Sequence, residues 1–175
     1  VTAAHRNLAG PKMANLAEAA RLGLKVPPGF VVTAAAWRGF MAAGGLQAEI
    51  DRRLQAHKNA AGSELFRLAS GLQQMVAAAE LPGELRRALA EAYAGLEELA
   101  GKGVRVILRS SALGEDEAGA SFAGQYKSLL NLSPEFLPEA YKEVVASKYS
   151  ARAIQYRRQY GLADQDQPIC VGCLA

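Results

Sequence analysis

This chain of 175 residues has little of what builds disulfide-bonded, secreted or membrane proteins. Its two cysteines are too few for the framework of bridges that holds small secreted domains together. No apolar run approaches the length of a membrane span, and the first residues lack the pattern of a signal peptide. We therefore expect a cytoplasmic protein with no membrane as a partner.

Aromatic residues are also scarce, at 7% of the chain, and they do not alternate with basic residues as on a base-stacking platform. The net charge is only +3, and the lysines and arginines are interleaved with acids. These features argue against nucleic acid as a partner. The mild basicity suits an anionic ligand, and general anion binding stays open as the weakest of three hypotheses.

The common motifs for phosphate binding and hydrolysis are missing as well. Residues 114–119 have the outer glycine spacing of a P-loop, but Ala120 stands where the lysine would be. No G-x-G-x-x-G follows a predicted strand, and G-x-S-x-G and H-E-x-x-H do not occur. The sequence therefore excludes a P-loop, a dinucleotide fingerprint, a nucleophile elbow and this type of zinc protease.

The few cysteines and histidines form no pattern that predicts chemistry. Cys170 and Cys173 have the spacing of half a zinc site, but residues three apart on a strand face opposite sides of it. We predict two buried, structural thiols. His57, near a predicted helix end, and His5, near the N-terminus, are expected to be solvated surface residues.

What the chain does contain is a helical region followed by a strand-rich one. We expect an α+β fold in one domain, residues 1–175, with a helical portion at about 34–100 and a phosphate-gripping, strand-rich portion at about 101–175. Its sheet is predicted to be small and mixed, with the last strand near an open edge. Thr33, Ser133 and Ser150 are typical of helix N-caps. Periodicity predicts helices at 12–22, from 34 to before Gly44, and at 46–57, 63–79, 83–100, 134–148 and 150–160, with strands at 30–32, 104–108, 128–132 and 168–174.

The segment from Val104 to Leu132 is the most informative for function. An apolar strand leads Arg109 into a Ser-rich turn, and an acidic pair, a small-residue loop at 119–124 and a second strand follow. This order suggests a surface that grips a polyphosphate, because arginine offers a rigid fork of donors and a small-residue loop lets backbone amides approach an anion. The structural alternative is a salt bridge from Arg109 to Glu115 or Asp116.

Three stretches resemble the family of phosphoenolpyruvate synthase and pyruvate phosphate dikinase, which includes rifampicin phosphotransferase. Their order and spacing agree along nearly the whole chain. They read N-L-A-G-P-K-M-A-N-L-A-E at 7–18 with G-L-K-V-P-P-G-F-V-V-T at 23–33, L-R-S-S at 108–111 with A-S-F-A-G-Q at 120–125, and S-K-Y-S at 147–150 with R-A-I and Y-R up to 157.

The resemblance implies the N-terminal subdomain of an ATP-grasp nucleotide-binding domain that binds ATP with Mg²⁺. It implies that Lys12 and Arg109 reach the ATP phosphates and that a loop from Ser121 to Gly124 closes over them. Ser128, where the family usually has threonine, is implied as a further phosphate contact. The magnesium ligands, the phosphohistidine domain and the acceptor domain are expected outside this chain. The chain itself is then a truncated ATP-dependent phosphotransferase without a catalytic residue of its own.

One departure from the family pattern leaves a second hypothesis open. The first motif usually reads Gly-Gly-Lys followed by Gly or Asn, whereas Pro11 precedes Lys12 here and Met13 follows it. Proline removes an amide donor, so phosphate contacts through this turn's backbone are in doubt, although the Lys12 side chain can still reach. The alternative is a non-catalytic nucleotide-binding or regulatory module that kept the scaffold.

Overall fold

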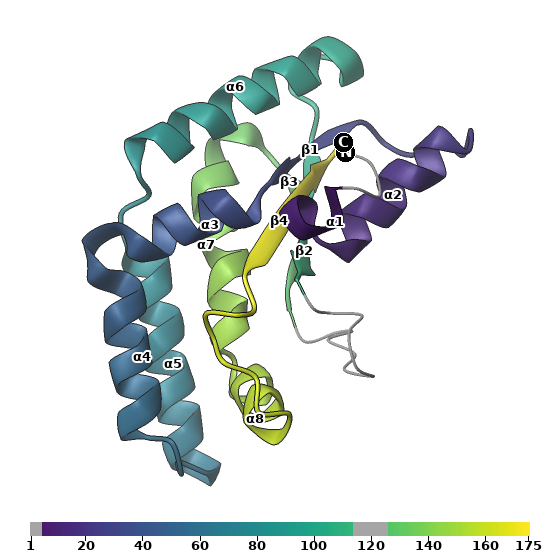
Figure 1. Ribbon diagram of the computed structural model, residues 1–175. Helices are drawn as coiled ribbons and strands as arrows, with labels where there is room; N and C mark the ends of the chain where they lie inside the picture. The colour runs from purple at the N-terminus through teal and green to yellow at the C-terminus, as the bar shows by residue number, and fades with distance from the viewer. Residues whose placement is uncertain (1–4, 114–125) are drawn as a thin grey trace.

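The computed structural model describes residues 5–113 and 126–175 (Figure 1). Within these ranges the chain is rich in helix and has one small sheet. Its elements in chain order are α1 (Arg6–Ala9), α2 (Pro11–Arg21), β1 (Gly29–Val32), α3 (Ala34–Ala42), α4 (Leu46–Ala56), α5 (Gly62–Ala78), α6 (Gly83–Ala100), β2 (Val106–Ala112), β3 (Ser128–Leu132), α7 (Leu137–Ala146), α8 (Ala151–Gln159) and β4 (Ile169–Leu174).

The strands of the described residues form one sheet in the order β1-β4-β2-β3, and each neighbouring pair is antiparallel. The α+β class is therefore confirmed, whereas the prediction of a mixed sheet is wrong. The predicted position of the last strand is also wrong. β4 pairs with β1 on one side and with β2 on the other, so it lies inside the sheet and its backbone is bonded on both sides.

One face of the sheet, here called the inner face, forms the core of the molecule. Helix α7 packs against β2, β3 and β4, while α3 contacts β4 and α6 contacts β1. Alternate strand residues point into this layer because side chains on a strand alternate between its faces. The buried apolar strand residues on this face are Val32 of β1, Val106, Leu108 and Ala112 of β2, and Ile169, Val171 and Cys173 of β4. Burying apolar surface at about 25 cal/mol per Å² is the main term that holds the layers together.

The predicted helices of the first half are confirmed almost to the residue. The Thr33 hydroxyl accepts a hydrogen bond from the Ala36 amide at 3.4 Å, so it caps α3 as expected. Gly44 and Gly45 have positive φ angles of 59° and 72° between α3 and α4, a conformation that costs glycine little. The helices α4 and α5 then form an antiparallel pair, and α5 packs on α7 and α8.

The helix predicted at 134–148 needs correction. Pro134–Phe136 and Ser147–Tyr149 are 3-10 turns, and only Leu137–Ala146 is α-helical. A helix from Pro134 would need an amide hydrogen at residue 138, which is proline and has none. The Ser133 hydroxyl makes no cap and accepts from Nη1 of Arg105 at 3.0 Å. The Ser150 cap is confirmed, with its hydroxyl accepting from the Ala153 amide at 3.2 Å.

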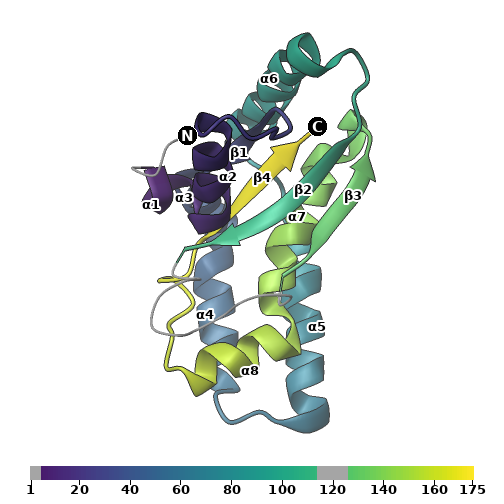
Figure 2. The same ribbon diagram turned by 90° about the vertical axis from the view of Figure 1, so that its right-hand side faces the viewer.

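The other face of the sheet, the outer face, is only half covered by described helices. Figure 2 shows α1 and α2 in front of the side of the sheet that carries β1 and β4, whereas β3 has no described helix in front of it. The start of α2 also lies against Ser111, near the end of β2. In the covered half, α2 lies close enough to β4 that a Cβ at Gly172 would overlap the side chain of Met13. Among residues 5–113 and 126–175, none of the helices thus covers β3 or the exposed Arg109 of β2 beside the start of α2.

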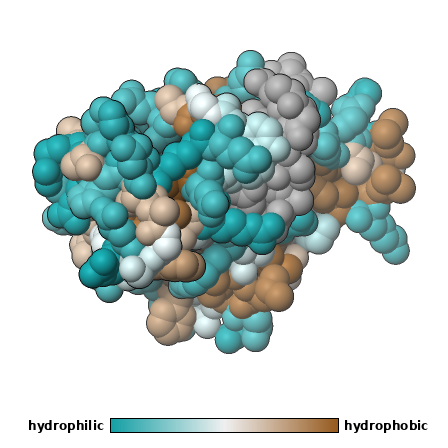
Figure 3. Space-filling view, turned by 90° about the horizontal axis from the view of Figure 1, so that it is seen from below, coloured by the Kyte–Doolittle hydropathy of each residue, from teal (hydrophilic) through white to brown (hydrophobic). Residues whose placement is uncertain are grey.

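The surface is mostly hydrophilic when the molecule is viewed from below, with hydrophobic residues gathered at the side where α2 lies (Figure 3). Leu22 and Leu24, just after α2, are 70% and 63% exposed. None of the described helices has the length and apolar character needed to cross a lipid bilayer.

Candidate functional site

The candidate site begins with β2, which is longer than the sequence indicated. The strand runs from Val106 to Ala112, so Arg109 lies within it and not in a Ser-rich turn after it. The reason is β4, whose residues from Leu174 back to Ile169 pair with β2 from Ile107 to Ala112. Side chains alternate along a strand, which places Arg109 and Ser111 together on the outer face.

Arg109 is exposed on this face. Its two register partners are Gly172 on β4 and Ser128 on β3. Its guanidinium forms no hydrogen bond or ion pair with any residue of the ranges 5–113 and 126–175. The alternative pairing with Glu115 or Asp116 lies outside the described residues.

The pairing of β2 with β3 places Ser128 directly opposite Arg109. Opposed residues in an antiparallel pair have Cβ atoms about 5 Å apart on the same face, so a hydroxyl donor lies beside the guanidinium. Both side chains are exposed. The other two predicted loop residues, Ser121 and Gly124, lie outside the described residues and stay predictions.

Lys12 lies in the first turn of α2, and its backbone is tied to the same strand. Gly10, with φ of +77°, turns the chain from α1 into α2, and Pro11 occupies the first helical position, where its missing amide hydrogen costs no intrahelical bond. The Lys12 amide donates to the Ser111 hydroxyl at 3.1 Å. That amide is therefore engaged within the protein, which agrees with the doubt about phosphate contacts through this turn's backbone.

The arrangement has the chemistry of an anion site. An exposed guanidinium, a neighbouring hydroxyl and a lysine at the start of a helix lie around one face of a sheet, and guanidinium groups bind phosphate oxygens through two parallel hydrogen bonds. Within the described residues, no group of three or more His, Cys, Asp or Glu side chains is placed to hold a metal ion. We assign no metal ligand to this face.

Comparisons with known proteins agree with the motifs. The family model described as "Pyruvate phosphate dikinase, AMP/ATP-binding domain" matches residues 6–175. The chain belongs to this family. A probable phosphoenolpyruvate synthase of Methanothermobacter thermautotrophicus is 38% identical over 154 residues, which are 87% of this chain and 22% of that protein. One of Methanocaldococcus jannaschii is 39% identical over 157 residues, 89% of this chain and 13% of the relative.

A phosphoenolpyruvate synthase of Aquifex aeolicus is 34% identical over 171 residues, 94% of this chain and 20% of the relative. The chain thus spans about a fifth or less of the length of these relatives, from 13% to 22%. The matched family model describes an AMP/ATP-binding domain. The whole relatives extend well beyond that domain.

This member of the dikinase family also has a buried charge cluster that sequence reasoning missed. Lys148 Nζ lies 3.1 Å from Oδ1 of Asp164 and donates to the Asp164 carbonyl at 2.7 Å. Arg157 Nη2 lies 3.3 Å from the same Oδ1, and Nη1 donates to the Lys148 carbonyl at 2.7 Å. Tyr149 and Gln47 each donate to Oδ2 of Asp164 at 3.0 Å. The cluster joins the segment before β4 to α4 and α8.

Burial and neighbouring charges shift the pKa values of this cluster in opposite directions. Burial lowers the pKa of Lys148 to about 8, although Asp164 favours its charged form. Burial alone would raise the pKa of Asp164, but Lys148 and Arg157 together hold it below its usual value. The motif residues S-K-Y-S and Y-R were visible in the sequence. Their partner Asp164 carried no signal, because it stands in an unpatterned loop.

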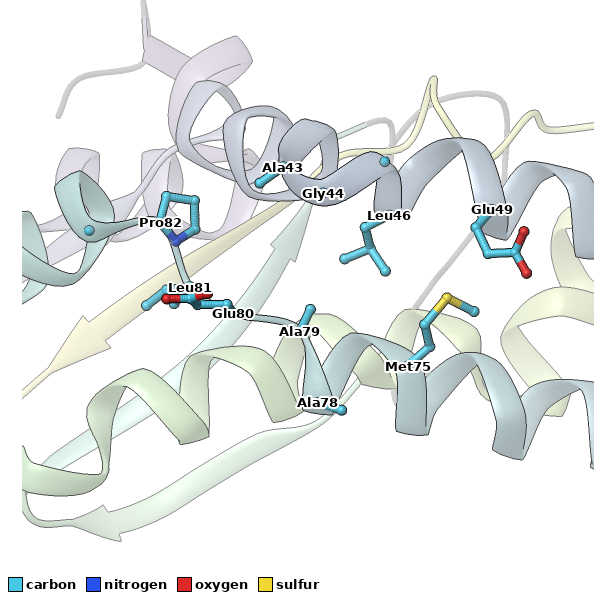
Figure 4. Close-up of a pocket in the computed structure, with 12 residues that line it drawn as sticks. Ala43, Gly44, Leu46, Glu49, Met75, Ala78, Ala79, Glu80, Leu81 and Pro82 are labelled. Atoms are coloured by element: carbon cyan, nitrogen blue, oxygen red, sulfur yellow. The ribbon is translucent and has the colours of Figure 1, made fainter.

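A hollow elsewhere in the described structure suits phosphate poorly. It measures about 550 Å³ and lies between the α3–α4 corner and the end of α5 (Figure 4). Its lining is mostly apolar, and its charged residues, Glu49 and Glu80, are both acidic and offer no donor to a phosphate. It shares no residue with the outer face, so the position of Arg109 identifies the candidate site better than cavity size does.

The remaining predictions for single residues are confirmed. Cys170 and Cys173 are fully buried, and burial raises the pKa of each thiol to about 12. Cys170 lies on the outer face, where its Sγ donates to the Leu8 carbonyl at 3.2 Å, whereas Cys173 belongs to the core. His57 ends α4 and is exposed, as is His5.

Proposed function

We propose that this chain is the ATP-binding portion of a phosphotransferase like phosphoenolpyruvate synthase, folded as one half of an ATP-grasp clamp. The observation that carries the proposal is Arg109, an exposed guanidinium beside Ser128 with no partner among the described residues. Membership of an AMP/ATP-binding family supports it. The outer face around Arg109 and Ser128 is then the surface that the triphosphate covers.

Each residue has a distinct task in this proposal. Arg109 binds two phosphate oxygens with its fork, and Ser128 adds a hydroxyl donor from the neighbouring strand. Lys12 supplies a compact charge that tolerates the movement of a phosphoryl group. The loop with Ser121 and Gly124 closes over the phosphates. Together these groups neutralise charge on the β- and γ-phosphates while a histidine of another domain accepts the phosphoryl group.

Magnesium, which ATP-dependent phosphoryl transfer uses, would neutralise part of the phosphate charge. The described residues gather no set of carboxylates for it. We therefore expect the protein ligands of the magnesium ion outside this chain.

The test is the affinity of the full-length protein for ATP with Mg²⁺, measured by calorimetry for the parent and for Arg109→Ala. Losing hydrogen bonds from a charged group predicts a dissociation constant raised about tenfold to a hundredfold. Arg105→Ala is the matched control, because Arg105 precedes the same strand but is engaged by Asn131 at 2.7 Å and by Ser133. Unchanged affinity in Arg109→Ala would remove Arg109 from the site.

One observation favours a second candidate, a nucleotide-binding module without catalysis. The Lys12 amide already donates to the Ser111 hydroxyl, and Pro11 has no amide hydrogen. This turn therefore offers a phosphate fewer backbone donors than a Gly-Gly-Lys turn would. Incubation of the full-length protein with γ-labelled ATP separates the two candidates. Base-stable, acid-labile label on the protein indicates a phosphohistidine and supports the enzyme. ATP binding without such label supports the module.

A further inference from the structure

The corner between α1 and α2 is docked on the sheet through contacts with Ser111 of β2 and Cys170 of β4. The Ser111 hydroxyl accepts from the Lys12 amide at 3.1 Å across 99 positions of sequence. A Cβ at Gly10 would overlap both the hydroxyl and the carbonyl of Ser111. The backbone before Lys12 therefore lies directly against this serine, at a separation that only glycine allows.

Ser111 is fully buried, and it shares the outer face of β2 with Arg109, two residues earlier. One strand thus carries the exposed guanidinium and the only side-chain acceptor that the described residues give to the Lys12 amide. Because a strand rises about 3.3 Å per residue and is rigid when paired on both sides, the two positions are fixed relative to each other. β2 is paired with β3 and β4 around Arg109.

We propose that Ser111 is a positioning residue of the phosphate site, which holds Lys12 in register with Arg109 through the Lys12 amide. This inference rests on the proposed function. Two cations that bind one polyphosphate must keep a fixed separation, since misplacing one of them by an ångström weakens a preorganised site. Ser111 does not touch the nucleotide in this role, because its hydroxyl is covered by Gly10 and Lys12.

The neighbouring serine supplies a matched control. Ser110 is also buried on β2, 4% exposed, but strand alternation places its side chain on the inner face, away from the face on which Ser111 accepts from the Lys12 amide. Dissociation constants for ATP and for AMP are measured on the full-length protein carrying Ser111→Ala or Ser110→Ala. We expect Ser111→Ala to weaken ATP about fivefold and to leave AMP unchanged, since AMP lacks the outer phosphates. Ser110→Ala should change neither.

A general loss of structure would act differently, because it would weaken ATP and AMP alike. Equal weakening of both nucleotides by Ser111→Ala would overturn the positioning role, as would unchanged affinity for both. If Ser111→Ala does not fold, Ser111→Cys keeps the volume with a weaker acceptor. It is then expected to weaken ATP about twofold and to spare AMP, and equal effects on both would again overturn the role.

A double-mutant cycle tests whether Ser111 acts through Lys12. In a Lys12→Ala background, Ser111→Ala should have no further effect on ATP affinity, because the cation that Ser111 positions is then absent. An undiminished effect in the Lys12→Ala background would overturn the positioning role alone. Unchanged ATP affinity in Lys12→Ala and Arg109→Ala would instead overturn the proposed function, so the two failures are distinguishable.

Discussion

Two arginines of this chain, Arg109 and Arg157, show opposite uses of the same side chain. Arg157 is 4% exposed and is held by the Lys148 carbonyl and the Asp164 carboxylate. Arg109 is exposed and has no partner in the described residues. A buried guanidinium must have its partners built in, because an uncompensated charge in the interior costs several kcal/mol. An exposed one stays hydrated until an anion arrives.

The two arginines therefore predict that stability and nucleotide affinity depend on different parts of the molecule. The cluster around Asp164 should matter for stability and little for nucleotide affinity. The surface around Arg109 should matter for affinity and little for stability. Four substitutions test this division, taken from the largest expected change in the free energy of unfolding to the smallest.

Asp164→Asn should have the largest effect, a loss of about 3 kcal/mol. It removes the one carboxylate that faces both Lys148 and Arg157 and leaves two buried cations without it. Urea unfolding of parent and variant at neutral pH measures the loss. Asp166→Asn, an exposed residue two positions on, is the control and should change stability by less than about 0.5 kcal/mol. Equal effects of both would show that the cluster is not a stabilising unit.

Gly172→Ala should cost about 2 kcal/mol, because a Cβ there overlaps the buried Met13 side chain of α2. The double variant with Met13→Ala frees that space and should be more stable than the sum of the single effects. Gly39→Ala is the control, since nothing lies near its Cβ position in α3, and it should stabilise by about 0.5 kcal/mol. Additive effects at residues 172 and 13 would contradict the close contact of α2 with β4.

Lys148→Met should cost about 1 kcal/mol at neutral pH, because Asp164 keeps Arg157, Tyr149 and Gln47 as partners. The effect of this substitution on the pH dependence of stability tests the pKa of Lys148 directly. The pKa of Lys148 is lowered to about 8 from its ordinary 10.5, so between these values the unfolded chain binds more protons than the folded one. In that window the parent gains stability as pH rises.

The variant lacks this contribution, so the stability difference in favour of the parent should increase between about pH 8 and pH 10. The buried tyrosine and cysteine side chains titrate in both proteins, so they cancel in the difference. Urea unfolding at pH 7, 8, 9 and 10 provides the measurement. A difference that stays constant over this range would mean that Lys148 keeps its ordinary pKa.

How far the sequence predicts this molecule depends on whether the signal is local. Thr33, Gly44 and Ser150 mark helix ends by their own conformational and capping preferences, and the structure follows them. The antiparallel sheet and the interior place of β4 depend on pairing between distant segments, which local periodicity does not encode. The helix at 134–148 was mispredicted because one missing amide hydrogen at Pro138 outweighed its apolar pattern.

The candidate site divides in the same way. Arg109, Lys12 and Ser128 were predicted from the family resemblance, and their residue types carry the chemistry of phosphate binding, but their contact with phosphate stays a proposal. Ser111 was visible within the same motif, but its contact with the Lys12 amide spans 99 positions and has no local signature. Asp164 was missed because a single acid in a loop looks like any solvated residue. Ser121 and Gly124 stay predictions.

Arg109→Met should have the smallest effect on folding, less than about 0.5 kcal/mol, since no interaction with a described residue is lost. The same substitution at Arg157 should cost at least 2 kcal/mol, because the Lys148 carbonyl loses its donor at 2.7 Å and Asp164 loses one of its cations. Both variants are unfolded in urea without nucleotide and again with ATP and Mg²⁺. Added ATP should stabilise the parent and Arg157→Met by similar increments and Arg109→Met by less, because ligand stabilisation follows the dissociation constant. A large loss of stability in Arg109→Met without nucleotide would mean that its guanidinium is already engaged in the fold, as in the salt-bridge hypothesis.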